Sequence, residues 1–195
     1  MKQRRILVVV GTRPEAIKMA PVIHALKQTP QFSCQVLATA QHRELMDQAL
    51  LEFGIEPDLD LDMMHPNQSL ATLTARLLVD FEQALLKCRP NAVLAQGDTT
   101  TVLAIALSCF YQRIPFGHVE AGLRTGDTAN PFPEEFNRVL ANRIAHWHFA
   151  PTAWARQNLL REGIAEWLKD ASPYGDGHAA GRIVQVLTEH FSPCA

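Results

Sequence analysis

The sequence predicts an α/β fold of the Rossmann-like type, in which a mainly parallel sheet lies between two layers of helices. Short apolar runs such as Ile6–Val10 are rich in β-branched residues, which is typical of parallel strands buried on both faces. Segments with helical spacing follow these runs one by one, as crossovers between parallel strands require. Glycine and polar residues gather where the runs end, and in this fold class ligands bind at that edge of the sheet.

Composition limits the class of protein. With 195 residues, 47% of them hydrophobic and 19% charged, the chain suits one large globular domain or two small ones. A net charge of -2 argues against a nucleic-acid partner, and no apolar run is long enough to cross a bilayer. The basic start Met1–Arg5 is followed by an apolar run that is too short for a signal peptide.

The four cysteines are scattered and show no C-x-x-C spacing, so they predict neither a metal site nor a disulfide framework. Reduced thiols are the default state of cysteines in the cytoplasm. We therefore expect a cytoplasmic protein with no metal, no nucleic-acid partner and no membrane partner.

The first strand–turn–helix unit carries the strongest local signal. The run Ile6–Val10 ends at Gly11, and Pro14 opens a helix, where its missing N–H has no partner to lose. Backbone N–H groups and the positive end of the helix dipole hold anions at such a turn, phosphates above all, and Arg13 and Lys18 lie within reach. Neither the dinucleotide nor the P-loop glycine pattern is present. Taken alone, the turn is equally well interpreted as a tight turn with surface charges.

The segments that follow are a strand over 33–40, a helix over 44–53 and a short irregular or edge segment over 58–64. The helix has apolar residues at helical spacing and ends at Gly54, a residue type favoured just after a helix. Ser69 predicts the N-cap of a long helix that runs through Lys87 and is stopped by Pro90.

The middle of the chain repeats the strand–turn–helix pattern. A buried strand over 92–96 passes through the turn Gly97–Thr101 into a helix over 102–111. The next strand, over 114–119, runs into Glu120–Arg124, and a loop over 125–133 that is rich in glycine, asparagine and proline follows.

The last third of the chain adds two further units. We expect a helix over 134–145, a short strand over 146–150 and a helix over 153–162. No strand is evident after Ala150, so the sheet is expected to end there. A last amphipathic helix over 178–191 is expected to pack on the outside of the sheet.

Three carboxylates are the candidates for chemistry at the edge where the strands end. Asp98, Glu120 and Glu134 each follow a strand or open a helix near that edge. A carboxylate at the end of a buried strand loses hydration, and the raised pKa that results suits proton transfer at a carbon. Asp98 is equally well interpreted as a helix N-cap. The case for Glu120 and Glu134 is stronger, and a partnership with Arg124 or Arg138 is the alternative.

Five segments of the chain form a connected set of motifs: Gly11–Pro21, Gln41–Arg43, Gly97–Thr101, Gly117–Arg124 and Pro133–Arg138. Together they resemble the non-hydrolysing UDP-N-acetylglucosamine 2-epimerases, and the match runs from Ile6 to about Ile164. The resemblance implies one half of a GT-B-type architecture, in which two Rossmann-like domains enclose the active site. It also implies conversion of UDP-N-acetylglucosamine (UDP-GlcNAc) to UDP-N-acetylmannosamine by elimination and re-addition of UDP, with no metal or nicotinamide cofactor.

The resemblance also implies roles for single residues. Asp98, Glu120 and Glu134 match the catalytic carboxylates of the family, and Arg13 and Lys18 match the cations that face the nucleotide diphosphate. The other residues of the expected substrate-binding set are Gly11, Thr12, Thr99 and His118. The residues alone favour the alternative, a structural role for this histidine.

A second ligand site is a further point of resemblance. Gln41 and His42 match a segment near which some bacterial relatives bind another UDP-GlcNAc as activator. Asn67 stands where those relatives carry a basic residue, so this segment is only a candidate activator region.

The resemblance changes after Ile164. The family continues there into a second domain, whereas this chain passes to Pro173–Ala179 and Arg182–Ile183, which resemble the extreme C-terminal end of the same family. We therefore expect an N-terminal domain over 1–164 and a C-terminal segment over 165–195 whose helix packs back on that domain. The intervening domain is then missing, through engineering or through a natural deletion.

The expected function is that of a UDP-GlcNAc 2-epimerase with little or no activity, because half a cleft leaves its carboxylates open to water. A non-catalytic folding unit that keeps the site residues is the alternative. A nucleotide-sugar hydrolase is disfavoured, because no nucleophile–base pair is visible. The expected ligands are UDP-GlcNAc and UDP, bound weakly, and the expected partner is a second copy of the chain in a homodimer.

Overall fold

The computed structural model describes residues 3–39, 43–61, 68–164, 168–169 and 177–192. Its strands are β1 (Arg4–Val10), β2 (Phe32–Ala38), β3 (Leu59–Asp60), β4 (Ala92–Gln96), β5 (Phe116–Val119), β6 (Trp147–Phe149) and β7 (Leu168–Lys169). Its helices are α1 (Arg13–Gln28), α2 (Arg43–Glu52), α3 (Leu70–Cys88), α4 (Thr100–Tyr111), α5 (Glu134–Ile144), α6 (Ala153–Arg161) and α7 (Ala179–Phe191).

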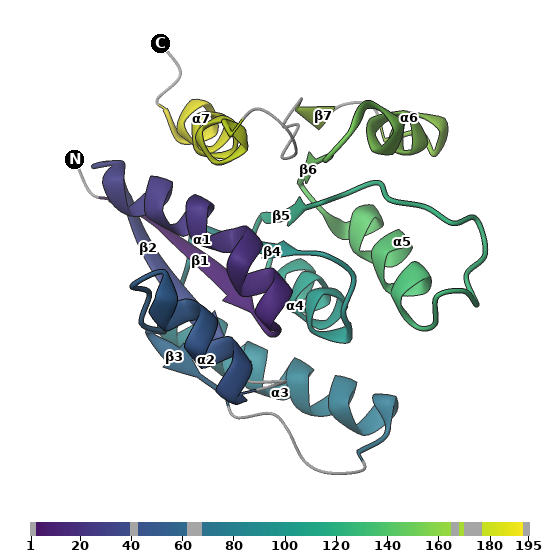
Figure 1. Cartoon of the computed structure of the whole chain (residues 1–195), viewed down its shortest axis with the longest axis horizontal. Coiled ribbons are helices and arrows are strands. Elements are labelled where there is room, and N and C mark those ends of the chain that lie inside the picture. The colour runs from purple at the N-terminus through teal and green to yellow at the C-terminus, as the bar shows by residue number, and fades with distance from the viewer. Residues whose placement is uncertain (1–2, 40–42, 62–67, 165–167, 170–176, 193–195) are drawn as a thin grey trace.

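The strands form one parallel sheet in the order β3-β2-β1-β4-β5-β6-β7 (Figure 1). Successive side chains of a strand point to opposite faces. Accordingly Ile6 and Val8 of β1 pack with α1, α2 and α7, whereas Leu7 and Val9 pack with α3, α4 and α5 on the other face. The predicted Rossmann-like arrangement of three layers is confirmed.

Helix starts follow the local sequence closely. Ser69 is the N-cap of α3, as predicted, and its side chain accepts a hydrogen bond from the backbone N–H of Thr72. The interpretation of Asp98 as an N-cap is wrong, because Thr99 caps α4 and its hydroxyl accepts from the N–H of Val102. The carboxylate of Asp98 is therefore left available for other contacts.

The expectation that the sheet ends after Ala150 is also wrong. The two-residue strand β7 pairs in parallel with β6, with His148 opposite Leu168 and Phe149 opposite Lys169. Two residues carry no readable alternation of apolar and polar side chains, so the sequence gives no signal for such a strand. The short segment β3, in contrast, is the edge strand that the sequence allowed.

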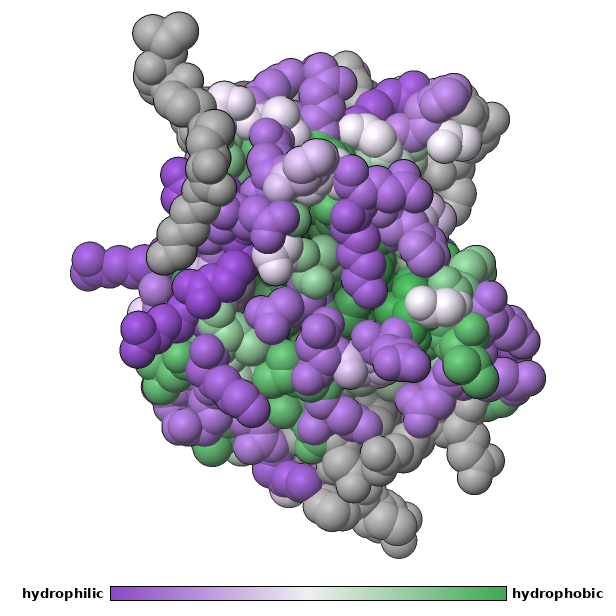
Figure 2. Space-filling model, turned by 90° about the vertical axis from the view of Figure 1, so that its left-hand side faces the viewer, coloured by the Kyte–Doolittle hydropathy of each residue, from purple (hydrophilic) through white to green (hydrophobic). Residues whose placement is uncertain are grey.

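The C-terminal helix α7 covers the sheet beside α1 (Figure 1). Its side chains Ile183, Val184, Val186 and Leu187 are buried in the same cluster as those of β1 and α1. Figure 2 shows the left-hand side of the molecule as seen in Figure 1, where hydrophilic residues cover most of the surface and hydrophobic ones are visible between them. The division of the chain at residue 164 remains a prediction.

Candidate active site

The two turns at the centre of the sheet face each other. Strand β1 lies between β2 and β4, and the helices that follow β1 and β4 leave to opposite faces of the sheet. Such a switch point opens a crevice at the carboxyl edge of a parallel sheet. Here the turn Gly11–Thr12 forms one side of the crevice and the turn Gly97–Thr99 forms the other.

Glu15 joins these two turns. Its Oε2 accepts hydrogen bonds from the backbone N–H of Gly11 at 2.6 Å and from that of Thr12 at 3.1 Å. Its Oε1 accepts from the hydroxyl of Thr99 at 3.0 Å. Thr12 completes a capping box with Glu15 at the start of α1. We call these four residues (Gly11, Thr12, Glu15 and Thr99) the floor of the site.

The floor corrects one expectation about ligand binding. The N–H groups of Gly11 and Thr12 donate to Glu15, so they are not available to hold a phosphate as the sequence suggested. The hydroxyl of Thr99 is likewise engaged with Glu15 and with the start of α4. An internal carboxyl group thus occupies the place at the helix N-terminus that an external anion was expected to take.

Burial governs the chemistry of Glu15. The residue is 4% exposed, and loss of hydration raises its pKa from the usual 4.5 to about 7, against the opposing effect of its hydrogen bonds. Packing around it is tight, because a Cβ on Gly11 would lie 2.6 Å from Oγ1 of Thr39 and 3.3 Å from Oγ1 of Thr101. Glycine is therefore the residue that fits at this position.

A second group of residues lies above the floor and is more exposed. We call Lys18, Asp98, Glu120 and Glu134 the mouth of the site. Nζ of Lys18 donates to both carboxylate oxygens of Glu120, at 2.8 and 2.9 Å, and the side-chain amide of Gln96 donates to the same carboxylate. Glu120 has φ +68°, a left-handed conformation that is uncommon for a residue with a side chain. Such conformations cluster at functional sites.

Asp98 is held by two residues of α5. Nη2 of Arg138 lies 2.7 Å from Oδ2 of Asp98, and the side-chain amide of Asn137 donates to the Asp98 carbonyl. Burial raises the pKa of Asp98, Arg138 lowers it, and the nearby carboxylates of Glu134 and Glu120 raise it again. The structure therefore brings the three predicted carboxylates together, which is the arrangement that favours proton transfer.

His118 lies inside the protein and does not line the mouth. It is fully buried, its Nε2 donates to the Gly97 carbonyl, and its Nδ1 accepts from the side-chain amide of Asn142. Burial lowers its pKa from 6.5 to about 4, so the ring is neutral near pH 7. Its geometry fits the structural alternative and corrects the expectation that it touches substrate.

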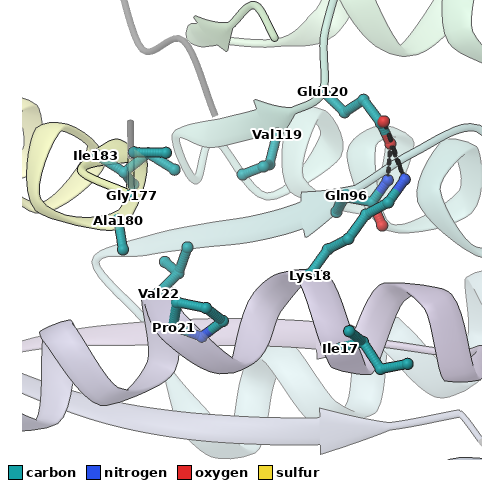
Figure 3. Close-up of a pocket in the computed structure, with 11 residues that line it drawn as sticks. Ile17, Lys18, Pro21, Val22, Gln96, Val119, Glu120, Gly177, Ala180 and Ile183 are labelled. Atoms are coloured by element: carbon teal, nitrogen blue, oxygen red, sulfur yellow. Dashed lines mark hydrogen bonds and ion pairs between the residues drawn. The ribbon is translucent and has the colours of Figure 1, made fainter. Parts of the chain in front are cut away.

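A cavity of about 240 Å³ adjoins the mouth between α1 and α7. Lys18 and Gln96 reach toward Glu120 on one side of it, and Val22, Val119 and Ile183 form its apolar side (Figure 3). Arg13 is exposed at the first position of α1, at the same edge of the sheet. Gln41 and His42, the candidate activator region, lie outside the described residues.

Sequence reasoning missed two residues that organise this site, Glu15 and Gln96, and it paired Arg138 with Glu120 or Glu134 and not with Asp98. The Thr12–Glu15 spacing of a capping box was the one available signal for Glu15. Within the residues that the structure describes, no group of three or more histidine, cysteine or acidic residues is placed to hold a metal ion. No helix in these same ranges is long and apolar enough to cross a membrane.

Comparison with known proteins gives consistent matches. A family model described as UDP-N-acetylglucosamine 2-epimerase matches residues 24–168. The UDP-N-acetylglucosamine 2-epimerase of Escherichia coli K12 is 56% identical over 162 residues, which are 83% of this chain and 43% of that protein. The chain thus spans less than half the length of the curated relatives it matches.

Two solved structures extend the comparison. The UDP-GlcNAc 2-epimerase from Neisseria meningitidis, bound to UDP-GlcNAc, matches with a TM-score of 0.82 at 42% identity, over 96% of this chain and 54% of that one. The enzyme from Methanocaldococcus jannaschii, in complex with UDP-GlcNAc and UDP, matches with a TM-score of 0.80 at 38% identity, over 86% of this chain and 46% of that one.

Proposed function

Because this chain belongs to the UDP-N-acetylglucosamine 2-epimerase family, we propose that it carries the N-terminal half of an active site that interconverts UDP-GlcNAc and UDP-N-acetylmannosamine. The observation that carries the proposal is the gathering of Asp98, Glu120 and Glu134 beside Lys18 at one edge of the sheet. Arg13 stands at the same edge.

The proposed reaction needs a base, an acid and stabilisation of negative charge. A carboxylate of the mouth removes the proton from C2 of the sugar, the C1–O bond breaks, and UDP leaves with the electron pair while a C1–C2 double bond forms. UDP then adds back to C1 as a proton returns to the opposite face of C2. Lys18 and Arg13 offset the charge of the departing diphosphate. The raised pKa of Asp98 suits it to hold the proton between these steps.

In this chain we propose that turnover is slow or absent. The chain passes directly from the N-terminal domain to a segment that resembles the family's last helix, so the second wall of the cleft is missing. Without that wall the carboxylates stay in contact with water, which weakens the electrostatic stabilisation of a developing charge. The sequence match to the E. coli protein covers 83% of this chain, whereas the structural match to the Neisseria protein covers 96%. The larger coverage supports a counterpart of the C-terminal segment in the Neisseria structure.

A non-catalytic folding unit is the second candidate, and one observation favours it. Two of the three acids of the mouth already have internal partners, since Glu120 pairs with Lys18 and Asp98 pairs with Arg138. A ligand must compete with these contacts.

One titration decides between the two candidates. Addition of UDP or UDP-GlcNAc is expected to raise the melting temperature of the chain, because a ligand that binds the folded form stabilises it. Calorimetry measures the affinity, and NMR detects any UDP-N-acetylmannosamine. If millimolar ligand neither raises the melting temperature nor gives a heat of binding, the result supports the non-catalytic folding unit. If the chain forms UDP-N-acetylmannosamine at an ordinary rate, the result contradicts the proposed loss of activity.

We also propose a homodimer through the face that α3 and α4 share. Val79 and Leu86 of α3 are 59% and 56% exposed, and Phe110 and Tyr111 of α4 are 64% and 67% exposed. A groove of about 210 Å³ lies between the two helices beside Val79 and Tyr111. Sedimentation of the chain and of a Phe110→Glu variant measures this association, and a monomeric wild-type chain at micromolar concentration contradicts it.

A further inference from the structure

We propose that Glu15 is a positioning residue whose proton is linked to anion binding at the mouth. Its carboxyl group holds the turn that carries Arg13 against the turn that carries Asp98, through Gly11 and Thr12 on one side and Thr99 on the other. The inference rests on the proposed function in one respect, since the anion that it concerns is the diphosphate of UDP.

The hydrogen bonds of the Glu15 carboxyl group fix the distance between the two turns. The first carboxylate oxygen receives two backbone donors of the β1–α1 turn, and the second receives a side chain of the β4–α4 turn, 84 residues away in the sequence. The carboxyl group itself is buried, because Glu15 is 4% exposed, whereas Thr12 and Thr99 are half-buried. In the described part of the chain, the hydrogen bonds of Glu15 run to Gly11, Thr12 and Thr99, so Glu15 positions Arg13 and Asp98 through the backbone of the two turns.

The linkage follows from charge. Glu15 lies in the first turn of α1, and the proposed function puts the diphosphate beside Arg13 and Lys18 of the same helix. An ionised Glu15 repels that diphosphate across a poorly screened interior, whereas a protonated Glu15 does not. Binding must therefore favour the protonated form, and by reciprocity protonation must favour binding.

The surroundings of Glu15 contain few competing charges. Thr39 after β2 and Thr101 of α4 are its uncharged neighbours around Gly11. The other charged or titratable groups on α1 and in the β4–α4 turn are Arg13, Lys18, His24, Lys27 and Asp98, and no charged group among the described residues contributes to the shift in the pKa of Glu15. Residues 40–42, which follow β2, lie outside the described ranges. Burial raises the pKa of Glu15 to about 7, so its ionisation falls within an accessible pH range.

The test compares four forms of the whole chain: the wild type and the variants Glu15→Gln, Glu15→Ala and Thr152→Ala. Calorimetry measures UDP affinity from about pH 5.5 to about pH 8.5, the range across which Glu15 ionises. Glutamine keeps an oxygen that accepts hydrogen bonds from the N–H groups of Gly11 and Thr12, but it carries no titrating proton. Alanine removes the hydrogen bonds that join the two turns. Thr152 is an exposed N-cap of α6, and its loss lowers stability without touching the site.

Each form has a distinct expected result. As pH rises across this range, the affinity of the wild type for UDP falls about tenfold more than the affinity of Glu15→Gln. The two proteins are compared at each pH, so the ionisation of UDP itself cancels. Glu15→Ala binds about tenfold more weakly than the wild type at low pH, where Glu15→Gln binds normally. Thr152→Ala follows the wild-type profile. If Glu15→Ala does not fold, the first comparison stands alone.

Two outcomes overturn different statements. Parallel pH profiles of the wild type and Glu15→Gln overturn the inference and leave the proposed function intact. If the wild type does not bind UDP, the proposed nucleotide binding fails, and the same profiles are measured with inorganic pyrophosphate, the simplest diphosphate. A pH-linked difference with pyrophosphate supports the inference without the nucleotide, and no such difference overturns it.

Discussion

The floor and the mouth hold their acids in opposite ways, although both lie at the same edge of the sheet. In the floor, Glu15 is 4% exposed, and all of its hydrogen-bond donors in the described part of the chain are uncharged. In the mouth, Glu120 lies 2.8 Å from the ammonium of Lys18, and Asp98 lies 2.7 Å from the guanidinium of Arg138.

The difference shows how the partner decides the charge of a buried acid. Uncharged donors stabilise a carboxylate less than its lost hydration destabilises it, so the pKa of Glu15 rises to about 7. A cation opposes the same burial effect at Asp98. The floor is therefore a frame that can exist without charge, and the mouth is a charged surface on which an external anion must displace internal pairs.

The largest expected effect is on the pH dependence of stability. The folded pKa of Glu15, about 7, lies above its usual 4.5, so between these values the folded state holds more protons and loses stability as pH rises. Glutamine does not ionise, so the stability of Glu15→Gln relative to the wild type should increase by about 3 kcal/mol from about pH 4.5 to about pH 8. Urea denaturation at several pH values measures this difference.

The control for this prediction is Glu162, which belongs to neither the floor nor the mouth. Its hydrogen bond with Arg124 lowers its pKa, so its contribution has the opposite sign and is lost as pH falls. Glu162→Gln should therefore lose stability relative to the wild type as pH rises. Equal pH dependence in the wild type and Glu15→Gln contradicts the description of the floor.

The next effect tests the packing of the floor. In Gly11→Ala the new Cβ lies 2.6 Å from Oγ1 of Thr39, so the turn must shift, and we expect a loss of about 2 kcal/mol. Gly181→Ala in α7 is the matched control, because nothing lies within 4 Å of its Cβ position. Alanine there should raise stability by about 0.5–1 kcal/mol. Thermal denaturation measures both, and equal effects contradict a crowded floor.

A third prediction concerns the cation beside Asp98. Arg138→Gln removes the group that lowers the pKa of Asp98, so that pKa should rise further, as followed by NMR of the carboxyl carbon. Loss of a charge-assisted contact in a partly buried place should cost about 1.5 kcal/mol of stability. An unchanged Asp98 titration means that Arg138 does not control this carboxyl group.

The smallest effect is expected for the ion pair in the mouth. The side chain of Lys18 is 39% exposed, so Lys18→Gln should change stability by less than about 1 kcal/mol, and salt should reduce the effect. The same substitution should weaken UDP binding clearly. A large loss of stability without loss of binding makes the pair a structural element.

The sequence predicts local features of this fold better than long-range ones. The strand over 92–96 and the cap at Ser69 follow from apolar runs and capping residues within a few positions, and both are confirmed. The sequence does not predict strand β7, because this strand depends on pairing with β6 and not on its own two residues. Local pattern therefore predicts the elements, and tertiary contacts decide the shortest of them.

The candidate site shows the same limit in chemical terms. Parallel strand ends explain why Asp98, Glu120 and Glu134 meet at one edge, so their grouping is readable from the order of the elements. The partner of an acid is not readable in this way. Glu15 is hydrogen-bonded to Thr99, 84 residues away in the sequence, and His118 to Asn142, 24 residues away. These long-range contacts decide which groups face a ligand.

The packing of α6 and α7 also determines where the chain tolerates extra sequence. Leu159 of α6 and Leu187 of α7 are fully buried, so both anchor points of the intervening segment are fixed by their own contacts. Polymer theory makes a longer connection costly only with the logarithm of its length, about 0.6 kcal/mol for each doubling. We therefore expect that a whole folded module, even an unrelated fluorescent reporter, spliced after β7 and before α7 leaves the register of the parallel sheet unchanged.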